Sequence, residues 1–354
     1  MKNGIIIKVG AVVLGLAVLF GGSFLIATLI EKKFTVGETI EGAGEAISRT
    51  EIEASNSIRE SVLNEANVAS SMSYNGHTYV YNENIDVLMI IGIDDYDVID
   101  YTKEGNLYNP MCSDLILLAV FDNVNQTYSL LQINRDTITD VMTYDSFGTF
   151  NRMAKRQIAM SHTYRPKQED ACEDTEFAVS HLLYDVEIDN YFSLTMNAIP
   201  IINDSVGGVT VTIEDDFSQL DDTLVQGETI TLMGDQAEHY VRGRRQITND
   251  PTNLNRMKRQ RTYMSSLLPV LGKKTASSNS FALELYDKLS SYMVTDCSTD
   301  QFSNYISQFS GYTLDKIITP DGRSTVSSDN HVEFYVDQDS LKSIVIDLFY
   351  VQQD

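Results

Sequence analysis

The feature of this chain that most restricts its folding is an uncharged stretch near its start. Residues 9–30 read VGAVVLGLAVLFGGSFLIATLI, 22 residues without a charged side chain. About 20 apolar residues in a helix suffice to cross the hydrocarbon core of a bilayer. A cleaved signal peptide has an apolar region of about 7–15 residues followed by a small-residue cleavage site, and this stretch fits neither criterion. The sequence therefore predicts a retained transmembrane anchor, preceded by a short tail over residues 1–8. Lysines flank both ends of the anchor (Lys2 and Lys8, Lys32 and Lys33), so charge does not decide its orientation.

The overall charge restricts the partners of the chain. Its 354 residues include 50 acidic and 26 basic side chains, a formal net charge of −24. Nucleic-acid binding depends on neutralising phosphates, so this balance argues against nucleic acid as a partner. Three cysteines follow the anchor (Cys112, Cys172 and Cys297), and in an extracytoplasmic domain they allow one disulfide and one free thiol, with all three pairings open.

Against this acidic background, residues 242–261 form a dense basic stretch, RGRRQITNDPTNLNRMKRQR. It contains seven cations and one acid: Arg242, Arg244, Arg245, Arg256, Lys258, Arg259 and Arg261, with Asp250. The planar guanidinium fork matches phosphate oxygens in a bidentate fashion, which favours a local anion site. The alternative is an exposed, charged helix face.

The remaining pattern predicts one layered domain. Residues 31–76 are polar and indicate a helical or partly flexible stalk, and the globular part begins near His77. Apolar runs predict strands at 86–93, 115–121, 128–133, 209–213 and 332–337. Helical patterns cover 151–162, 175–184, 196–204, 234–241, 253–270, 279–293, 299–309 and 338–349. Mixed strands and helices predict an α/β fold, layered α/β/α, with a main domain over residues 77–278 that residues 279–354 complete.

Polar residues lie where the predicted strands end. Asp94 follows the first strand, Asp114 precedes the second, and Arg135 follows the third. Carboxylates at strand ends can hold Mg²⁺ together with substrate phosphates, and ligands of open α/β sheets bind at such ends. Turn-forming aspartates and a structural salt bridge between Arg135 and Asp136 are the alternatives.

Taken in order, these segments resemble the LytR–CpsA–Psr (LCP) proteins of Gram-positive cell envelopes. LMIIGIDD is similar to the family's LLLGxD, and SDLILLAVFDNVNQTYSLLQINRDT is similar to its SDTxxLxxxNxxxxxxxLxSIPRDT. AVSHLLYDVEIDNYFSLTMNAIPIINDSVGGVTV resembles the segment ending LVDxLGGVxV. QGETITLMGDQAEHYVRGR resembles GxxxLxGxxALxYxRxR, and NRMKRQR resembles GRxxRQ.

The resemblance implies an LCP-like α/β/α domain that holds a polyprenyl-pyrophosphate-linked glycopolymer and transfers it onto peptidoglycan. It implies Mg²⁺ (or Mn²⁺) bound by Asp94 and Asp114. It also implies contacts to the pyrophosphate or reacting groups from Arg135, Arg242, Arg244, Arg256 and Gln260. The family layout of anchor, stalk and domain implies a single-pass protein of the cell membrane, with a cytoplasmic tail over residues 1–8, the large domain extracellular and membrane lipid as a partner.

The chain departs from the family pattern at four positions, which carry Cys112, Asn134, Gln157 and Asn253 in place of arginine, proline, a basic residue and an acid. Lys155 or Arg156 would then bind the phosphate in place of the arginine that Cys112 replaces, and Asp250 is the nearest carboxylate to Asn253. Two alternatives to transfer therefore remain, a non-catalytic or regulatory module that binds lipid-linked glycopolymer and a polyprenyl-pyrophosphate hydrolase. An apolar tunnel for the polyprenyl tail, or plain core, is expected from Phe177, Leu182, Leu183, Ile199 and Ile202.

Overall fold

The computed structural model describes residues 57–62, 69–94, 111–145, 148–244, 246–248, 250–278, 280–309, 311–328 and 331–353. The predicted anchor over residues 9–30, its cytoplasmic tail and most of the predicted stalk lie outside the described residues. Within the described part of the chain, no helix combines the length and the apolar character needed to span a bilayer.

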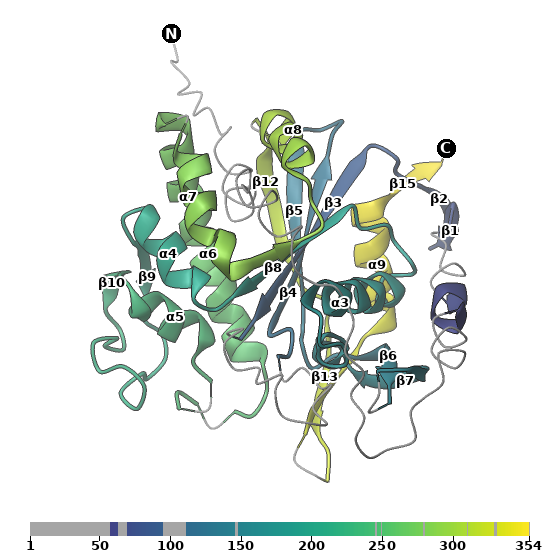
Figure 1. The fold of residues 1–354 in the computed structure, drawn as a ribbon, viewed down its shortest axis with the longest axis horizontal. Coiled ribbons are helices and arrows are strands. Elements are labelled where there is room, and N and C mark those ends of the chain that lie inside the picture. The colour runs from purple at the N-terminus through teal and green to yellow at the C-terminus, as the bar shows by residue number, and fades with distance from the viewer. Residues whose placement is uncertain are drawn as a thin grey trace, which may run out of the picture.

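A six-stranded mixed sheet forms the centre of the domain, in the order β11–β8–β3–β4–β5–β12 (Figure 1). Its strands are β3 (Ile85–Ile93), β4 (Leu115–Asp122), β5 (Thr127–Ile133), β8 (Asn190–Thr195), β11 (Met293–Thr295) and β12 (Thr313–Ile318). β3, β4 and β5 form an antiparallel meander, whereas β8 lies parallel to β3 and β12 parallel to β5. The meander strands are apolar runs buried on both faces, as expected for a sheet covered on two sides.

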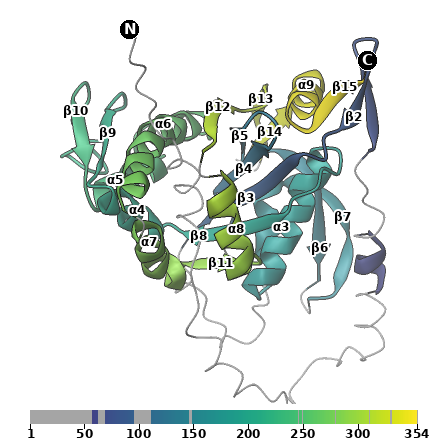
Figure 2. The same cartoon turned by 90° about the horizontal axis from the view of Figure 1, so that it is seen from above.

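Helices cover both faces of this sheet (Figure 2). Side chains of β3 alternate, so that Leu88 and Ile90 enter one core and Met89 and Ile91 the other. The first core is covered by α4 (Ala198–Ser205), α5 (Asp235–Arg242), α6 (Leu254–Ser277), α7 (Phe281–Leu289) and α8 (Thr299–Phe309). The second is covered by η2 (Ile158–Thr163), α3 (Gln168–Leu182) and α9 (Gln338–Phe349). The arrangement is the α/β/α layering predicted from the sequence.

Four smaller β elements surround the sheet. They are the hairpins β6 (Ile138–Tyr144) with β7 (Phe150–Gln157), β9 (Val209–Thr212) with β10 (Thr229–Leu232), β13 (Gly322–Val326) with β14 (Val332–Val336), and β1 (Ser71–Tyr74) with β2 (His77–Tyr81). β15 (Tyr350–Gln353) adds to β2. The helix predicted over 151–162 is therefore wrong in its first half, because that segment is β7, which pairs with β6 from Gln157 opposite Ile138.

The ends of the described chain are built into the domain. The boundary expected between residues 76 and 77 falls inside the β1–β2 hairpin. β15 completes a three-stranded sheet with this hairpin, so the hairpin is part of the domain. Residues beyond 279 supply both edge strands of the main sheet, β11 and β12, and the covering helix α9. All three cysteines lie in the described part of the chain and are free, so the disulfide that the sequence allowed does not form.

A helical turn over residues 57–62 packs against the second face of the domain. Its Arg59 is buried and its Nη2 lies 2.9 Å from Oδ1 of Asp174, a carboxylate of α3 with no exposed surface. Arg59 Nε donates to the hydroxyl of Tyr144 at 3.0 Å, and that hydroxyl donates to Asp174 at 2.9 Å. Part of the predicted stalk is thus docked on the domain through a buried ion pair.

Candidate active site

The predicted strand-end residues lie together at one edge of the sheet. The amide of Asp114 donates to the carbonyl of Gly92 at 2.7 Å, which places Asp114 beside the end of β3 and Asp94. Ile116, near the start of β4, pairs with Ile133, the last residue of β5. The chain therefore leaves β5 at the same edge, where Arg135 follows. Gly92 is needed for this close approach, because a Cβ there would lie 2.9 Å from the Cβ of Leu115.

Asp114 is the centre of an arginine cluster. Its Oδ1 forms an ion pair with Nη1 of Arg135, and its Oδ2 lies 3.1 Å from Nη1 of Arg256. Arg135 follows β5, whereas Arg256 lies in the first turn of α6. The two guanidinium groups therefore come from segments 121 residues apart and meet on one carboxylate.

Arg242 and Arg244 join the same region. Arg242, the last residue of α5, places Nη2 2.7 Å from Oδ1 of Asp94. Arg244 Nη2 lies 3.7 Å from Oδ2 of Asp136, and Arg135 Nε lies 3.6 Å from the other oxygen of that carboxylate. The structure thus brings all four predicted arginines and both predicted metal ligands to one edge of the sheet.

Burial makes this cluster electrostatically costly. Burial, with the charges of Arg135 and Arg244, lowers the pKa of Arg256 to about 9. Burial likewise raises the pKa of Asp136, although Arg135, Arg244 and Arg256 oppose the shift. Several cations held this closely repel one another unless carboxylates or a bound anion separate them. In the structure Asp94, Asp114 and Asp136 lie between the four arginines and reduce this repulsion.

Side-chain amides at three departures from the family pattern contact Arg256, Asp136 or one another. Asn253 Oδ1 accepts a hydrogen bond from Arg256 Nε at 2.7 Å, and Asn253 Nδ2 donates to Asn134 Oδ1 at 3.3 Å. Gln157 Nε2 donates to Asp136 Oδ1 at 3.2 Å. Because amides carry no charge, these contacts orient the charged groups without neutralising them.

Other predicted groups have structural partners. Gln260 Oε1 accepts from Gln132 at 2.8 Å and its Nε2 donates to the carbonyl of Val241 at 3.4 Å, which fixes α6 against β5 and α5. Lys155 pairs with Asp140 at 2.7 Å, and Asp250 accepts from the amide of Thr252 at 2.8 Å.

The basic stretch as a whole is divided between the site and the scaffold. Lys258 pairs with Glu214, Arg259 pairs with Asp215, and Arg261 donates to Gln132. Arg245 lies outside the described residues. Of the six described cations, Arg242, Arg244 and Arg256 face the cluster at the edge of the sheet.

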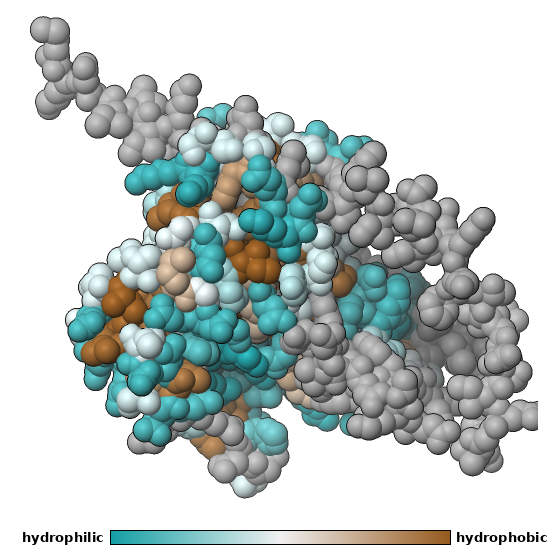
Figure 3. Space-filling view, turned by 60° about the vertical axis from the view of Figure 1, so that its left-hand side comes forward, coloured by the Kyte–Doolittle hydropathy of each residue, from teal (hydrophilic) through white to brown (hydrophobic). Residues whose placement is uncertain are grey.

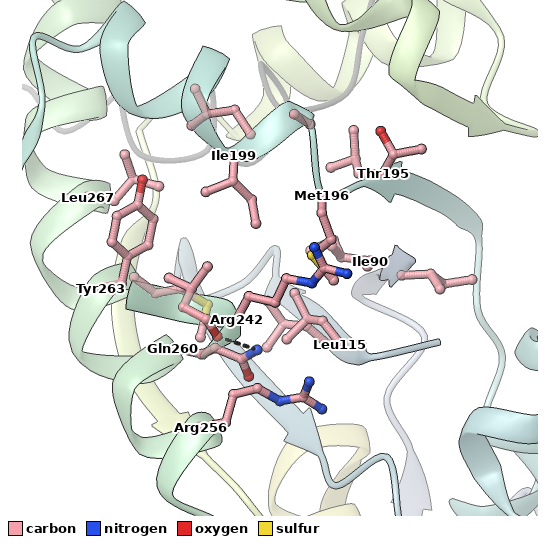
Figure 4. A pocket seen from close by; sticks show the side chains of 18 of the residues that line it. Ile90, Leu115, Thr195, Met196, Ile199, Arg242, Arg256, Gln260, Tyr263 and Leu267 are labelled. Atoms are coloured by element: carbon pink, nitrogen blue, oxygen red, sulfur yellow. Dashed lines mark hydrogen bonds between the residues drawn. The ribbon is translucent and has the colours of Figure 1, made fainter. Parts of the chain in front are cut away.

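The arginine cluster adjoins an apolar cavity of about 120 Å³ between the sheet and helices α4 and α6. In Figure 4, Arg242 reaches across the view above Arg256, while Ile199, Tyr263 and Leu267 lie to the upper left. Of the predicted tunnel residues, Ile199 and Ile202 line the cavity.

The other three predicted tunnel residues, Phe177, Leu182 and Leu183, do not line it. They pack on the opposite face of the sheet, because α3 covers that face. The lining residues of α6 (Tyr263, Met264, Leu267 and Leu268) were not predicted from the sequence, although their spacing of three and four residues is the signal of one helix face.

Asp94 and Asp114 offer the oxygen ligands that Mg²⁺ and Mn²⁺ prefer. Among the described residues no group of three or more His, Cys, Asp or Glu side chains is placed to hold a metal ion. Two carboxylates beside an anion site suit an ion that keeps several waters and shares a bound phosphate.

The structure is a layered α/β domain in which an arginine cluster adjoins an apolar cavity. The chain belongs to the LytR_cpsA_psr family, whose sequence model matches residues 47–348. The resemblance seen in the strand-end motifs is thereby confirmed.

Two curated relatives are named polyisoprenyl-teichoic acid–peptidoglycan teichoic acid transferase TagU. The protein of Halalkalibacterium halodurans is 28% identical over 148 residues, which cover 42% of this chain and 44% of the relative. That of Bacillus cereus is 30% identical over 169 residues, which cover 48% of each. The matches thus span less than half the length of either relative.

Solved structures share the fold. The crystal structure of B. subtilis TagV superposes with a TM-score of 0.56 at 21% identity, covering 75% of this chain and 96% of TagV. A structure described as TagT bound to LI-WTA has a TM-score of 0.55 at 18% identity, covering 75% of this chain and 90% of that chain.

Proposed function

We propose that this protein is a membrane-anchored phosphotransferase that moves a glycopolymer from a polyprenyl-pyrophosphate carrier onto peptidoglycan. The convergence of Arg135, Arg242, Arg244 and Arg256 beside an apolar cavity carries the proposal. An anion site alone would fit many phosphates, whereas an anion site that opens into an apolar space fits a pyrophosphate attached to a prenyl chain. The names of the two TagU relatives, which pair a polyisoprenyl-linked teichoic acid with peptidoglycan, agree with this proposal.

The arginines have a defined part in the reaction. Their guanidinium groups bind the pyrophosphate oxygens and stabilise the negative charge that grows on them in the transition state. A bound Mg²⁺ held by Asp94 and Asp114 would supply further charge neutralisation. In the structure these two carboxylates pair with Arg242, Arg135 and Arg256, so binding of a pyrophosphate exchanges one set of ion pairs for another.

The bond changes follow from the substrates. A hydroxyl of the acceptor glycan attacks the phosphorus atom nearest the glycopolymer and releases its proton to solvent. The new phosphoester bond forms as the pyrophosphate linkage breaks, and polyprenyl phosphate leaves with the bonding electrons. The apolar walls at Leu115, Ile199 and Leu267 hold the first isoprenoid units and exclude water from the linkage.

The test is a transfer assay with the full chain in lipid nanodiscs. The donor is a polyprenyl-pyrophosphate-linked oligosaccharide, the acceptor is purified glycan strands, and the released polyprenyl phosphate is measured. Arg256→Lys keeps one charge but loses the fork that reaches both Asp114 and Asn253, so we expect turnover to fall at least about tenfold. Lys258→Ala is the matched control, because Lys258 lies on the same helix and pairs with Glu214.

The outcomes separate the three candidate functions. Transfer that depends on Arg256 supports the proposal. Tight donor binding without turnover would instead identify a binding module, and release of polyprenyl phosphate without any acceptor would identify a hydrolase.

A further inference from the structure

One buried polar group beside the arginine cluster takes part in none of the contacts described so far. On the side of the molecule that carries α5 and α7, the surface is mainly hydrophilic with separate apolar patches (Figure 3), and polar side chains there can bond to water. The side-chain nitrogen of Asn134 is different, because Asn134 is only 3% exposed and its Nδ2 is buried. Nδ2 has no hydrogen-bond partner among the residues that the structure describes. A buried donor without a partner is unfavourable, so its presence calls for an explanation.

The orientation of the Asn134 carboxamide is fixed by a group that can only donate. Its Oδ1 accepts a hydrogen bond from the backbone amide of Asp136 at 3.1 Å, in a turn that the amide of Thr137 closes onto the carbonyl of Asn134 at 3.0 Å. Asn253 Nδ2 donates to the same Oδ1 at 3.3 Å. Because a backbone amide cannot accept, the atom that faces it must be the oxygen, and the NH2 group of Asn134 points elsewhere.

The same contacts place this carboxamide next to two guanidinium groups. Asn134 directly precedes Arg135 in the chain, and Asn253 accepts a hydrogen bond from Nε of Arg256 at 2.7 Å. Arg135 and Arg256 meet on the two oxygens of Asp114. Nδ2 of Asn134 is therefore a neutral hydrogen-bond donor within a group of cations.

The charges around Asn134 select the class of partner. Three guanidinium groups, those of Arg135, Arg244 and Arg256, contact two carboxylates, those of Asp114 and Asp136, which leaves one positive charge in excess. A water molecule would accept from Nδ2 but would leave this charge in place. An anionic oxygen accepts from Nδ2 and also offsets the excess charge, so it suits the position better.

The cluster is open to such an anion on one side. The side chains of Arg135 and Arg244 are 15% and 21% exposed, whereas that of Arg256 is 4% exposed. A ligand therefore enters past Arg135 and Arg244 and meets Arg256 and Asn134 at the inner end. A phosphoryl group carries several oxygens, so one such group can bind a guanidinium and Nδ2 together.

We propose that Nδ2 of Asn134 donates a hydrogen bond to a phosphoryl oxygen of the donor pyrophosphate; the assignment rests on the proposed function. The contact adds a neutral donor to the charged ones, at the oxygens on which negative charge grows during transfer. The family pattern has proline at this position, and a proline side chain has no donor to offer. Asn134 is thus a catalytic residue that belongs to this chain's own version of the site.

The test measures binding of inorganic pyrophosphate to the full chain in lipid nanodiscs by calorimetry, without donor lipid or acceptor. Asn134→Leu is similar in size and removes the donor without adding charge. We expect the affinity to fall at least about tenfold, the loss that corresponds to one hydrogen bond to a charged group.

Asn82→Leu is the matched control and should bind pyrophosphate like the wild type. Asn82 Oδ1 accepts from the backbone amide of Asn84 at 3.1 Å, also two residues further on. It precedes the start of β3, whereas the arginine cluster lies beyond the end of that strand.

A double-replacement cycle separates direct contact from support of Arg256. Asn134→Leu also removes the acceptor for Asn253, which holds Arg256. If Asn134 acted only through Asn253, Asn134→Leu would change nothing in a chain that already carries Asn253→Leu. We expect a further loss of about tenfold in that background, because Nδ2 contacts the phosphate itself.

Asn134→Asp covers the case in which the leucine variant does not fold. Aspartate keeps the oxygen that accepts from the amide of Asp136, and therefore the turn, but it has no NH2 group. This variant should also bind pyrophosphate at least about tenfold more weakly than the wild type.

Transfer kinetics give the second readout. Asn134→Leu should lower kcat at least about tenfold and leave KM for the acceptor glycan unchanged. Wild-type affinity for pyrophosphate in Asn134→Leu or Asn134→Asp would overturn the proposal, and so would the lack of a further loss in the Asn253→Leu background or a wild type that binds no pyrophosphate. If the wild type binds pyrophosphate through Asn134 but transfers no glycopolymer, the contact stands and the proposed function fails.

Discussion

Replacing Arg59 tests whether the segment before the first strand is part of the folded domain. Arg59→Met keeps the length and apolar stem of the side chain but removes the charge opposite Asp174. Asp174 has no exposed surface, and its carboxylate accepts hydrogen bonds from Arg59 and Tyr144 at 2.9 Å each. The variant therefore leaves a buried carboxylate without its main counter-charge.

The magnitude follows from that burial. Breaking a buried ion pair by removing one partner costs about 3–5 kcal/mol. Arg165 remains nearby, with its guanidinium 4.9 Å from the ring centre of Tyr144 and its charge acting on Asp174. We therefore expect the lower end of the range, about 3 kcal/mol, measured as the loss in the free energy of unfolding from urea denaturation.

The pH dependence adds a second check. Burial raises the pKa of Asp174 above its ordinary value of 3.8, and Arg59 opposes that rise. Without Arg59 the pKa rises further, so the folded state binds a proton more tightly than the unfolded state does. The destabilisation should then be greatest at neutral pH and shrink as the pH falls toward about 4.

A double replacement of Arg59 by methionine and Asp174 by leucine should recover most of the lost stability, because no charge is left buried. If Arg59→Met costs less than about 1 kcal/mol at pH 7, the pair does not form in solution and the docking of this segment is refuted.

Four further predictions concern stability, transfer, metal binding and membrane topology. Burial lowers the pKa of His162 from 6.5 to about 4, so the free energy of unfolding should fall by about 3 kcal/mol as the pH drops from 6.5 to 4. His162→Gln should flatten this dependence of the unfolding free energy on pH, and an unchanged dependence would show that His162 is not its cause. Arg244→Lys should transfer glycopolymer far more slowly than wild type, and equal rates would remove Arg244 from the site. In calorimetry, Asp94→Asn and Asp114→Asn should each lose Mg²⁺-dependent donor binding; wild-type binding by both would show the metal ligands to be wrong. Protease added to intact cells should remove the large domain, and full protection would reverse the predicted topology.

The sequence predicts the three strands of the central meander but misses β8, a fully buried strand that pairs with β3. Long apolar runs mark β3, β4 and β5 to within one residue, because strands buried on both faces need continuous apolar side chains. β7 carries Arg152, Lys155 and Arg156, whose spacing resembles a helix face, and only pairing with β6 makes the segment a strand. β12 escaped prediction because it is a short edge strand held by parallel pairing to β5.

For the site, the sequence identifies the groups but not their mutual contacts. Family motifs indicate Arg135 and Arg256, yet nothing in a linear pattern shows that both meet at Asp114. The role of Asn253 as a support for Arg256 depends on a contact to Asn134, which lies 119 residues earlier. Such contacts follow from the tertiary fold, so only a structure reveals them.

The pairing of β15 with β2 has a consequence for the order of folding. Val351 lies opposite Val80, a separation of 271 residues, and β12 likewise returns to β5 from far along the chain. Contacts this distant in sequence form slowly, because a long loop must close first. During synthesis, β2 stays an unpaired edge strand on that side, open to pairing with other chains, until residues 350–353 have been made. Removing those four residues would therefore leave an exposed strand edge about 270 residues away in the sequence, at the start of the domain.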